Sequence, residues 1–353
     1  MIKEETSQLA IVQSGIASLA QGLPSLDHNP STAREVEELT RMMGQSAMNP
    51  TSLAQLEIPK REPIIGEWFR EGDLGFVFAP RGLGKTWLSM LMARKCADGH
   101  GSCGLWTVHR TKKVLYVDGE MPLDSMLERD RLIASLPSEN LTFLQHEAFF
   151  HQHGRVLNLS DPTTQQALLA HCQANGVEIL ILDNLSCLFS GVKENDADAW
   201  ELVLPWLLTL RRNRIAVVIV AHAGRNGQMR GTSRREDAAF WVIQLSEVAD
   251  AASPKTGARF VSKFIKNRNG TEEACPSYQW EFTTKPTLDE VEVRCAIVSP
   301  LDQLVGWVRD GLSSASDIAV EMGVSKGQVS KLAKQAIERG LIRKEAREYL
   351  PCP

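Results

Sequence analysis

A glycine-rich turn between an apolar run and a helical pattern constrains this chain more than any other feature. Residues 75–79 read Gly-Phe-Val-Phe-Ala, which fits a buried strand, and a helical pattern begins near Trp87. Backbone N–H groups of the loop between them, and of the first helical turn, can wrap an anion. The order strand, loop and helix therefore predicts an α/β fold with a phosphate-binding loop.

The loop ends in a lysine and a threonine, in the position of a Walker A motif. There Lys85 meets the β and γ oxygens of ATP and Thr86 holds Mg²⁺. The first glycine of the consensus is Ala79 here, and alanine fits if its φ stays negative. The residues expected to bind the nucleotide are Ala79, Pro80, Arg81, Gly82, Leu83, Gly84, Lys85, Thr86 and Trp87.

Two further apolar runs end in acidic residues. Residues 177–183 read Val-Glu-Ile-Leu-Ile-Leu-Asp, a Walker B pattern that predicts that Asp183 reaches the magnesium ion, directly or through water. After the run at 113–118, Glu120 is the candidate base that polarises the attacking water, and Asp118 is the alternative. The carboxyl ends of parallel strands converge on one crevice, so these acids are expected near the phosphate loop.

Sequence patterning divides the chain into three predicted parts. Residues 1–57 form an arm or linker with one helix at 31–43, begun by Ser31 or Thr32 with Glu35 at capping-box spacing. Residues 58–298 alternate strands and helices, as in a predominantly parallel α/β sheet, and residues 299–353 form a small second domain. The expected strands lie at 75–79, 113–118, 142–145, 178–183, 216–221, 240–245 and 259–266.

Charge and cysteine usage narrow the functional classes. A net charge of −4 excludes a uniformly basic coat for nucleic acid but leaves room for a basic patch. Seven cysteines without a CxxC pair predict reduced thiols, and the spacing of Cys96, His100, Cys103 and His109 matches no strong zinc pattern. No apolar run reaches the roughly 20 residues of a membrane span, and the N-terminus makes a poor signal peptide, so a cytoplasmic protein is expected.

The motifs, taken in order, resemble a known family. The Walker A loop, DGE after the second strand, ILILDN and IVAHAG are similar to the RecA-like ATPase core, in particular to hexameric helicases of the plasmid RepA type and their DnaB-like relatives. The resemblance covers about Pro63–Lys285. It implies that Glu120 is the catalytic base and that His222, at a strand end, senses the γ-phosphate. It also implies single-stranded or duplex DNA as partner and a homo-oligomeric ring, often six-fold.

The same resemblance implies cations that act on the neighbouring subunit's nucleotide. Residues 264–270 are similar to the KxRNG segment of DnaB-like helicases, whose lysine and arginine, here Lys266 and Arg268, reach the neighbour's γ-phosphate. Residues 229–233 are similar to the RGS stretch of RepA-type proteins, in which the arginine, here Arg230, has this role. The choice between Arg268 and Arg230 stays open. DNA is expected at the loops 186–197 and 224–236.

The C-terminal part resembles a helix-turn-helix. Gly323 would supply the turn, Ser325 would cap the second helix, and residues 342–350 could form the wing of a winged-helix domain. Both DNA and a protein partner stay open for this part. The inward-facing positions are Val329, Leu332 and Ala336, and those expected to face DNA are Lys326, Gln328, Ser330, Lys331 and Lys334.

The motifs, together with the family resemblance, imply a RecA-like ATPase core with a C-terminal winged helix, which hydrolyses ATP with Mg²⁺ to move along or unwind DNA. The expected setting is plasmid or mobile-element replication, with active sites at subunit interfaces. One alternative is a RecA-like recombination or repair ATPase that forms filaments. The other is a regulator whose winged helix binds a specific DNA site and whose ATP switches assembly.

Overall fold

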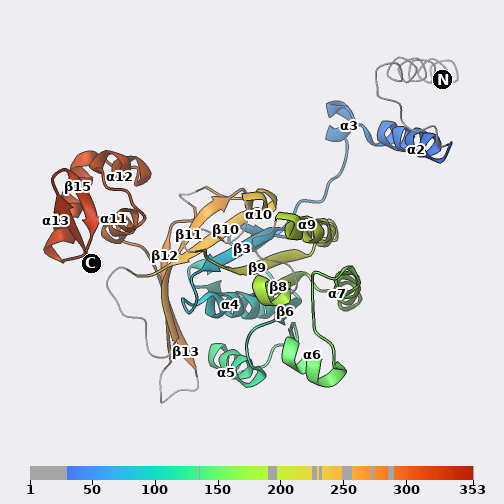
Figure 1. Cartoon of the computed structure of the whole chain (residues 1–353), viewed down its shortest axis with the longest axis horizontal. Helices are drawn as coiled ribbons and strands as arrows, with labels where there is room; N and C mark the ends of the chain where they lie inside the picture. The colour runs from blue at the N-terminus through green and yellow to red at the C-terminus, as the bar shows by residue number, and fades with distance from the viewer. Residues whose placement is uncertain are drawn as a thin grey trace. The chain divides into compact units, whose positions relative to one another are not determined.

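The computed structural model describes residues 30–134, 136–189, 197–224, 229, 233–248, 257–271, 274–284 and 290–352 (Figure 1). The chain divides into two units, residues 1–60 and 61–353. In the first unit, the predicted helix is present as α2 (Pro30–Ser46), and α3 (Pro50–Ala54) follows. The predicted cap of α2 is wrong, because the helix already begins at Pro30, which suits a first helical position, so Ser31 and Thr32 lie inside it.

The second unit is built on a nine-stranded sheet with the order β13-β12-β11-β10-β3-β9-β8-β6-β7. The neighbours from β10 to β7 pair in parallel, whereas β10 to β13 pair antiparallel. The predicted α/β fold with a mostly parallel sheet is confirmed. The strands are β3 (Leu74–Ala79), β6 (Val114–Asp118), β7 (Leu141–Gln145), β8 (Ile179–Asp183), β9 (Ala216–His222), β10 (Trp241–Ser246), β11 (Gly257–Asn267), β12 (Tyr278–Thr284) and β13 (Val291–Ile297).

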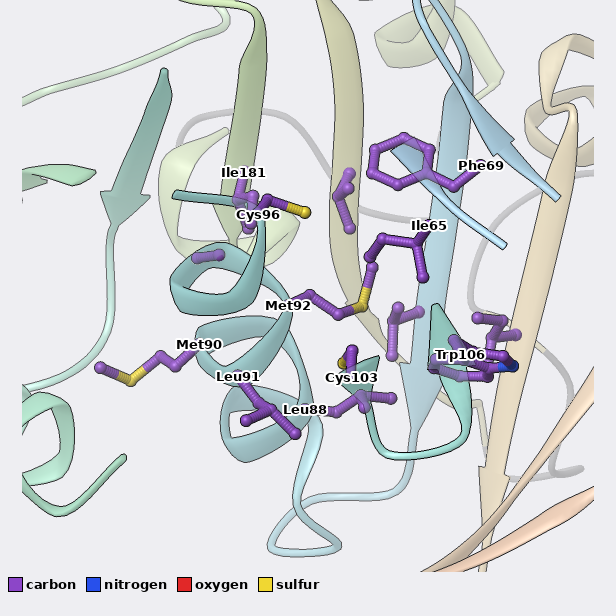
Figure 2. Packing of buried hydrophobic residues seen from close by; sticks show 14 of the residues in the cluster. Ile65, Phe69, Leu88, Met90, Leu91, Met92, Cys96, Cys103, Trp106 and Ile181 are labelled. Carbon is purple, nitrogen blue, oxygen red and sulfur yellow. The ribbon is translucent and has the colours of Figure 1, made fainter. Parts of the chain in front are cut away.

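Helices cover both faces of the parallel strands, which explains why those strands read as continuous apolar runs. On one face, Val77 and Ile181 pack with α4 (Lys85–Asp98). Figure 2 shows Met92 of α4 reaching toward Ile65 in this layer. On the other face, alternate strand residues such as Phe76 and Leu182 form a second core. That core is covered by α7 (Pro162–Asn175), α8 (Leu185–Leu188) and α9 (Ala197–Arg212).

Smaller elements complete this part. Two hairpins pack at the sheet, β1 (Pro63–Ile65) with β2 (Phe69–Arg70), and β4 (Ser102–Cys103) with β5 (Trp106–Thr107). The thiols of Cys96 and Cys103 are buried in the core, and no metal-binding cluster is found among the described residues. The remaining helices are α5 (Leu123–Ile133), α6 (His146–His153) and α10 (Ser233–Ala238).

The C-terminal residues form three helices and a hairpin around a core of their own: α11 (Pro300–Arg309), α12 (Ala315–Glu321), α13 (Lys326–Glu338), β14 (Ile342–Glu345) and β15 (Glu348–Pro351). Gly323 has a φ of 62° between α12 and α13, and Ser325 caps α13 in a capping box with Gln328. Gln328 was expected to face DNA, but its side chain is engaged in this cap, which holds it at the helix start. In the described segments, every helix is too short or too polar to cross a membrane.

Candidate active site

The phosphate loop lies between the end of β3 and the start of α4. Gly82 and Gly84 have φ values of 77° and 108°, a region that other residues rarely adopt. A Cβ at Gly84 would come within 2.8 Å of the Phe260 ring, so this glycine is also required for packing. Ala79 is not among the positive-φ residues, which explains how alanine replaces the first consensus glycine.

Lys85 is buried beneath the loop, where its Nζ donates to the carbonyl oxygens of Ala79 at 3.2 Å and Pro80 at 2.9 Å. Residues 80–82 are exposed and form the outer rim. Trp87, in contrast, is buried, with its ring 5.7 Å from that of Phe282. The side chain of Trp87 thus belongs to the core, and only its backbone N–H is available to a phosphate.

Thr86 and Asp183 come together beside the loop. The Thr86 hydroxyl and the Tyr116 hydroxyl both hydrogen-bond the Asp183 carboxylate, the latter donating at 2.6 Å. Burial raises the pKa of Asp183, although these bonds and the nearby charges of Lys85 and Arg129 act against it. A buried carboxylate next to a threonine hydroxyl and a phosphate loop is the donor set that Mg²⁺ prefers. The residues therefore fit the predicted ion.

Tyr116 was not predicted as part of the site. Its ring lies inside the sheet, and its hydroxyl links Asp183 to Ser89 of α4, 2.8 Å away. The available signal was a tyrosine in an otherwise aliphatic buried strand, because a buried phenol needs a polar partner.

The two acids after β6 have different surroundings. Asp118 is buried, and its Oδ1 accepts the backbone N–H groups of Glu120 at 3.0 Å and Met121 at 2.8 Å. Burial, followed by the charge of Asp183, raises the pKa of Asp118 to about 7. The Glu120 side chain is 53% exposed. Asp118 thus shapes the turn that presents Glu120, and Glu120 is the acid that solvent can reach.

His222 and Glu120 meet through a residue that sequence reasoning had not assigned. His222 ends β9 in register with Ala79 and is buried. Its Nε2 lies 3.8 Å from Glu120 Oε2 and 3.2 Å from Asn184 Nδ2, and the same Nδ2 donates to Glu120 Oε2. The signal for Asn184 was an amide directly after the Walker B aspartate.

Lys266 and Arg268 lie near the N-terminal ends of the parallel strands, opposite to the phosphate loop. Asn267 of β11 pairs with Trp241, which pairs with Gly75 near the start of β3. At roughly 3.3 Å per residue, about 13 Å of strand separates this position from the phosphate loop. Lys266 Nζ donates to the carbonyl of Glu236, and Arg268 Nη2 donates to that of Asp237 at 2.9 Å, at the end of α10. The structure does not bring these two cations to their own chain's site.

The other predicted cation and most of the predicted DNA loops cannot be placed. Arg230 lies outside the described residues, as do residues 190–196, 225–228, 231 and 232 of the two loops. The site that is described therefore consists of the phosphate loop, Thr86, Asp183, Glu120, Asn184 and His222.

A mixed, mostly parallel sheet with a phosphate loop after a central strand and an acid ending a nearby strand is the core of a P-loop ATPase. The model of a family of AAA domains, AAA_25, matches residues 41–228, more than half of the chain, and the chain belongs to this family. No curated protein matches the chain.

Two archaeal proteins are among the solved structures to which the chain is similar. The flagellar accessory protein FlaH from Methanocaldococcus jannaschii matches with a TM-score of 0.42 and 10% identity, over 64% of this chain and 91% of that chain. A KaiC-like protein from Pyrococcus horikoshii matches with a TM-score of 0.44 and 15% identity, over 67% of this chain and 99% of that chain.

Proposed function

We propose that this ATPase is a DNA-translocating or DNA-unwinding motor, of the replicative helicase type, whose active sites lie between subunits of a ring. One observation carries the proposal. The phosphate loop, the predicted Mg²⁺ ligands and the proposed base Glu120 lie together at the carboxyl ends of the strands. Lys266 and Arg268 lie at the opposite, N-terminal ends. Cations placed there are out of reach of their own site but can serve the site of an adjacent copy. Hydrolysis would then depend on assembly.

Each residue of the site has a role in this proposal. The loop backbone and Lys85 would bind the ATP phosphates, and Thr86 and Asp183 would hold Mg²⁺, which neutralises charge on the β and γ oxygens when bound. Glu120 accepts the proton of the attacking water, because it is the exposed acid at the crevice. His222 contacts the same acid through Asn184 and can pass a change at Glu120 to β9.

The C-terminal part is proposed as a winged-helix domain at residues 299–353, and residues 1–57 as an arm that contacts a neighbouring subunit. A separate hydrophobic core and a capped second helix support the first assignment. Lys326, Lys331 and Lys334 are exposed on α13 and would contact DNA phosphates. The same lysines favour a second candidate, a regulator whose winged helix binds a specific duplex site.

Strand displacement on a forked DNA substrate tests the motor, and the molecular mass with and without ATP and single-stranded DNA tests the ring. We expect ATP-dependent displacement by a closed oligomer of fixed mass. Polymers that lengthen on single-stranded DNA without displacing a strand would favour the recombination or repair ATPase. A specific duplex footprint without displacement would favour the regulator.

A further inference from the structure

The side-chain amide of Asn184 lies at the centre of the site and is fully engaged. The side chain is buried, with 1% of the residue exposed. Its Nδ2 donates to Glu120 Oε2 and lies 3.2 Å from His222 Nε2. Its Oδ1 accepts the backbone N–H of Cys187 at 3.1 Å and thereby caps α8. One residue thus contacts the proposed base, the proposed sensor and the start of the segment that follows Walker B.

The cap fixes which way the amide points. The Cys187 N–H can only donate, so the atom facing it must be the carbonyl oxygen of Asn184. The two Nδ2 hydrogens then face Glu120 and His222, and His222 Nε2 must act as the acceptor. In this arrangement the amide supplies a donor to each of its two partners. The geometry therefore specifies the hydrogen-bond direction throughout the group.

Glu120 needs such a partner because its side chain is long and more than half exposed. The Asp118 carboxylate fixes only the backbone at Glu120. In the part of the chain that is described, Asn184 is the one hydrogen-bond donor to the Glu120 carboxylate. A base that rotates freely spends little time aligned with the attacking water, and small misplacements reduce rates steeply.

We propose that Asn184 is a positioning residue that aligns the Glu120 carboxylate for hydrolysis and joins it to His222 and α8. This inference rests on the proposed role of Glu120 as the base. The competing explanation is that Asn184 serves only to cap α8, as asparagine commonly does at helix starts. The two roles use different atoms of the amide, Nδ2 for positioning and Oδ1 for the cap, so they can be separated.

Asn184→Ser and Asn184→Asp both keep an oxygen that can cap α8 and both remove the Nδ2 donor. For Asn184→Ser we expect kcat for ATP to fall roughly 10- to 100-fold, with KM for ATP and the melting temperature nearly unchanged. Asn184→Asp should lose more, because it also places a second carboxylate beside Glu120. Asn49→Ser is the matched control, since Asn49 caps α3 in the same way, and it should leave kcat unchanged.

A kcat within about twofold of wild type, or above it, in a folded Asn184→Ser protein would overturn the inference and leave the capping role alone. Should Asn184→Asp fold poorly, Asn184→Ser still decides the question, because it adds no charge. Glu120→Gln separates this inference from the function on which it rests. If Glu120→Gln is inactive while both Asn184 variants are normal, only the positioning role fails. If Glu120→Gln hydrolyses ATP normally, the base assignment fails.

A purely structural role for Asn184 predicts a different result when the Asn184 and Glu120 substitutions are combined. If Asn184 acts through Glu120, adding Asn184→Ser to Glu120→Gln should reduce the residual rate by less than about threefold. An unabated 10- to 100-fold loss in that background would show that the amide acts on something other than the base, and would contradict the proposal.

Discussion

Acidic side chains lie at both ends of the parallel strands, but their partners differ. At the N-terminal ends, Lys112 Nζ contacts Glu71 at 2.8 Å and Glu178 at 2.7 Å, and Arg61 pairs with Asp73. At the carboxyl ends, Asp183 is bonded by hydroxyl groups, and Asp118 Oδ2 has no hydrogen-bond partner among the described residues. At the N-terminal ends, the acidic side chains are neutralised by ion pairs that connect neighbouring segments of the fold. The carboxyl ends keep buried negative charge available, which stabilises a fold poorly but suits a site for Mg²⁺ and a nucleotide.

The largest effect should come from the one lysine beneath the loop. Lys85→Ala removes the charge over the β- and γ-phosphates, and we expect it to abolish ATP turnover. The fold should survive, because the hydrogen bonds that Lys85 Nζ donates to Ala79 and Pro80 lie within the loop itself. Phosphate release and a thermal melt measure the two expectations. Normal turnover in this variant would contradict an ATPase that uses this loop.

The next largest effect should come from Arg268, at the N-terminal ends of the strands, which is proposed to act on the site at the carboxyl ends in a neighbouring subunit. Arg268→Ala should lower hydrolysis by about 10³–10⁵-fold with little change in nucleotide binding, because an arginine supplied in trans stabilises the transition state. Glu120→Gln should be nearly inactive as well, with only a small residual rate. Mixing the two inactive proteins should restore part of the activity, since some interfaces then join an intact Glu120 to an intact Arg268.

Repeating the mixture with Arg230→Ala in place of Arg268→Ala identifies which arginine acts in trans. A mixture that stays inactive although subunits exchange, together with arginine variants that hydrolyse ATP normally alone, would place the whole site within one chain. The cations at the N-terminal ends of the strands would then have no part in hydrolysis at the carboxyl ends.

The sequence predicted the carboxyl ends of the strands better than anything else. Apolar runs that are buried on both faces are easy to recognise, and in a parallel sheet their final residues must meet. It did not predict β12 and β13, whose inward and outward positions alternate and whose pairing is antiparallel. The contacts of Asn184 and Tyr116 depend on neighbours distant in the sequence. The position of Lys266 and Arg268 depends on the direction of β11, which no local pattern reveals.

Removing charge at the carboxyl end should stabilise the protein. Asp118→Asn keeps the Oδ1 acceptor and removes a buried carboxylate whose folded-state pKa is raised to about 7 from 3.8. In the wild type, stability is lost as the pH rises from about 4 to about 7, because only the unfolded state ionises freely there. The variant should therefore gain roughly 2–4 kcal/mol in free energy of unfolding above pH 7, and nothing below pH 4. Urea unfolding across this range, without nucleotide or Mg²⁺, measures the gain.

Removing a charge at the N-terminal ends of the strands should instead lower the free energy of unfolding, and by a smaller amount. Lys112 is buried, and its bonds to Glu178 and Glu71 raise its pKa although burial lowers it. Lys112→Met leaves Glu71 paired with Arg214, 3.8 Å away, and we expect a loss on the order of 2 kcal/mol in the free energy of unfolding, below that of fully buried pairs because this contact remains and Glu178 is 43% exposed. The pKa of Glu71 is lowered below 4.5 by Lys112 despite burial, so its contribution is present above that pH and disappears below it. The loss should thus shrink in acid while kcat stays normal at pH 7. A stable Lys112→Met protein with impaired turnover would mean that the N-terminal ends serve the reaction rather than the fold.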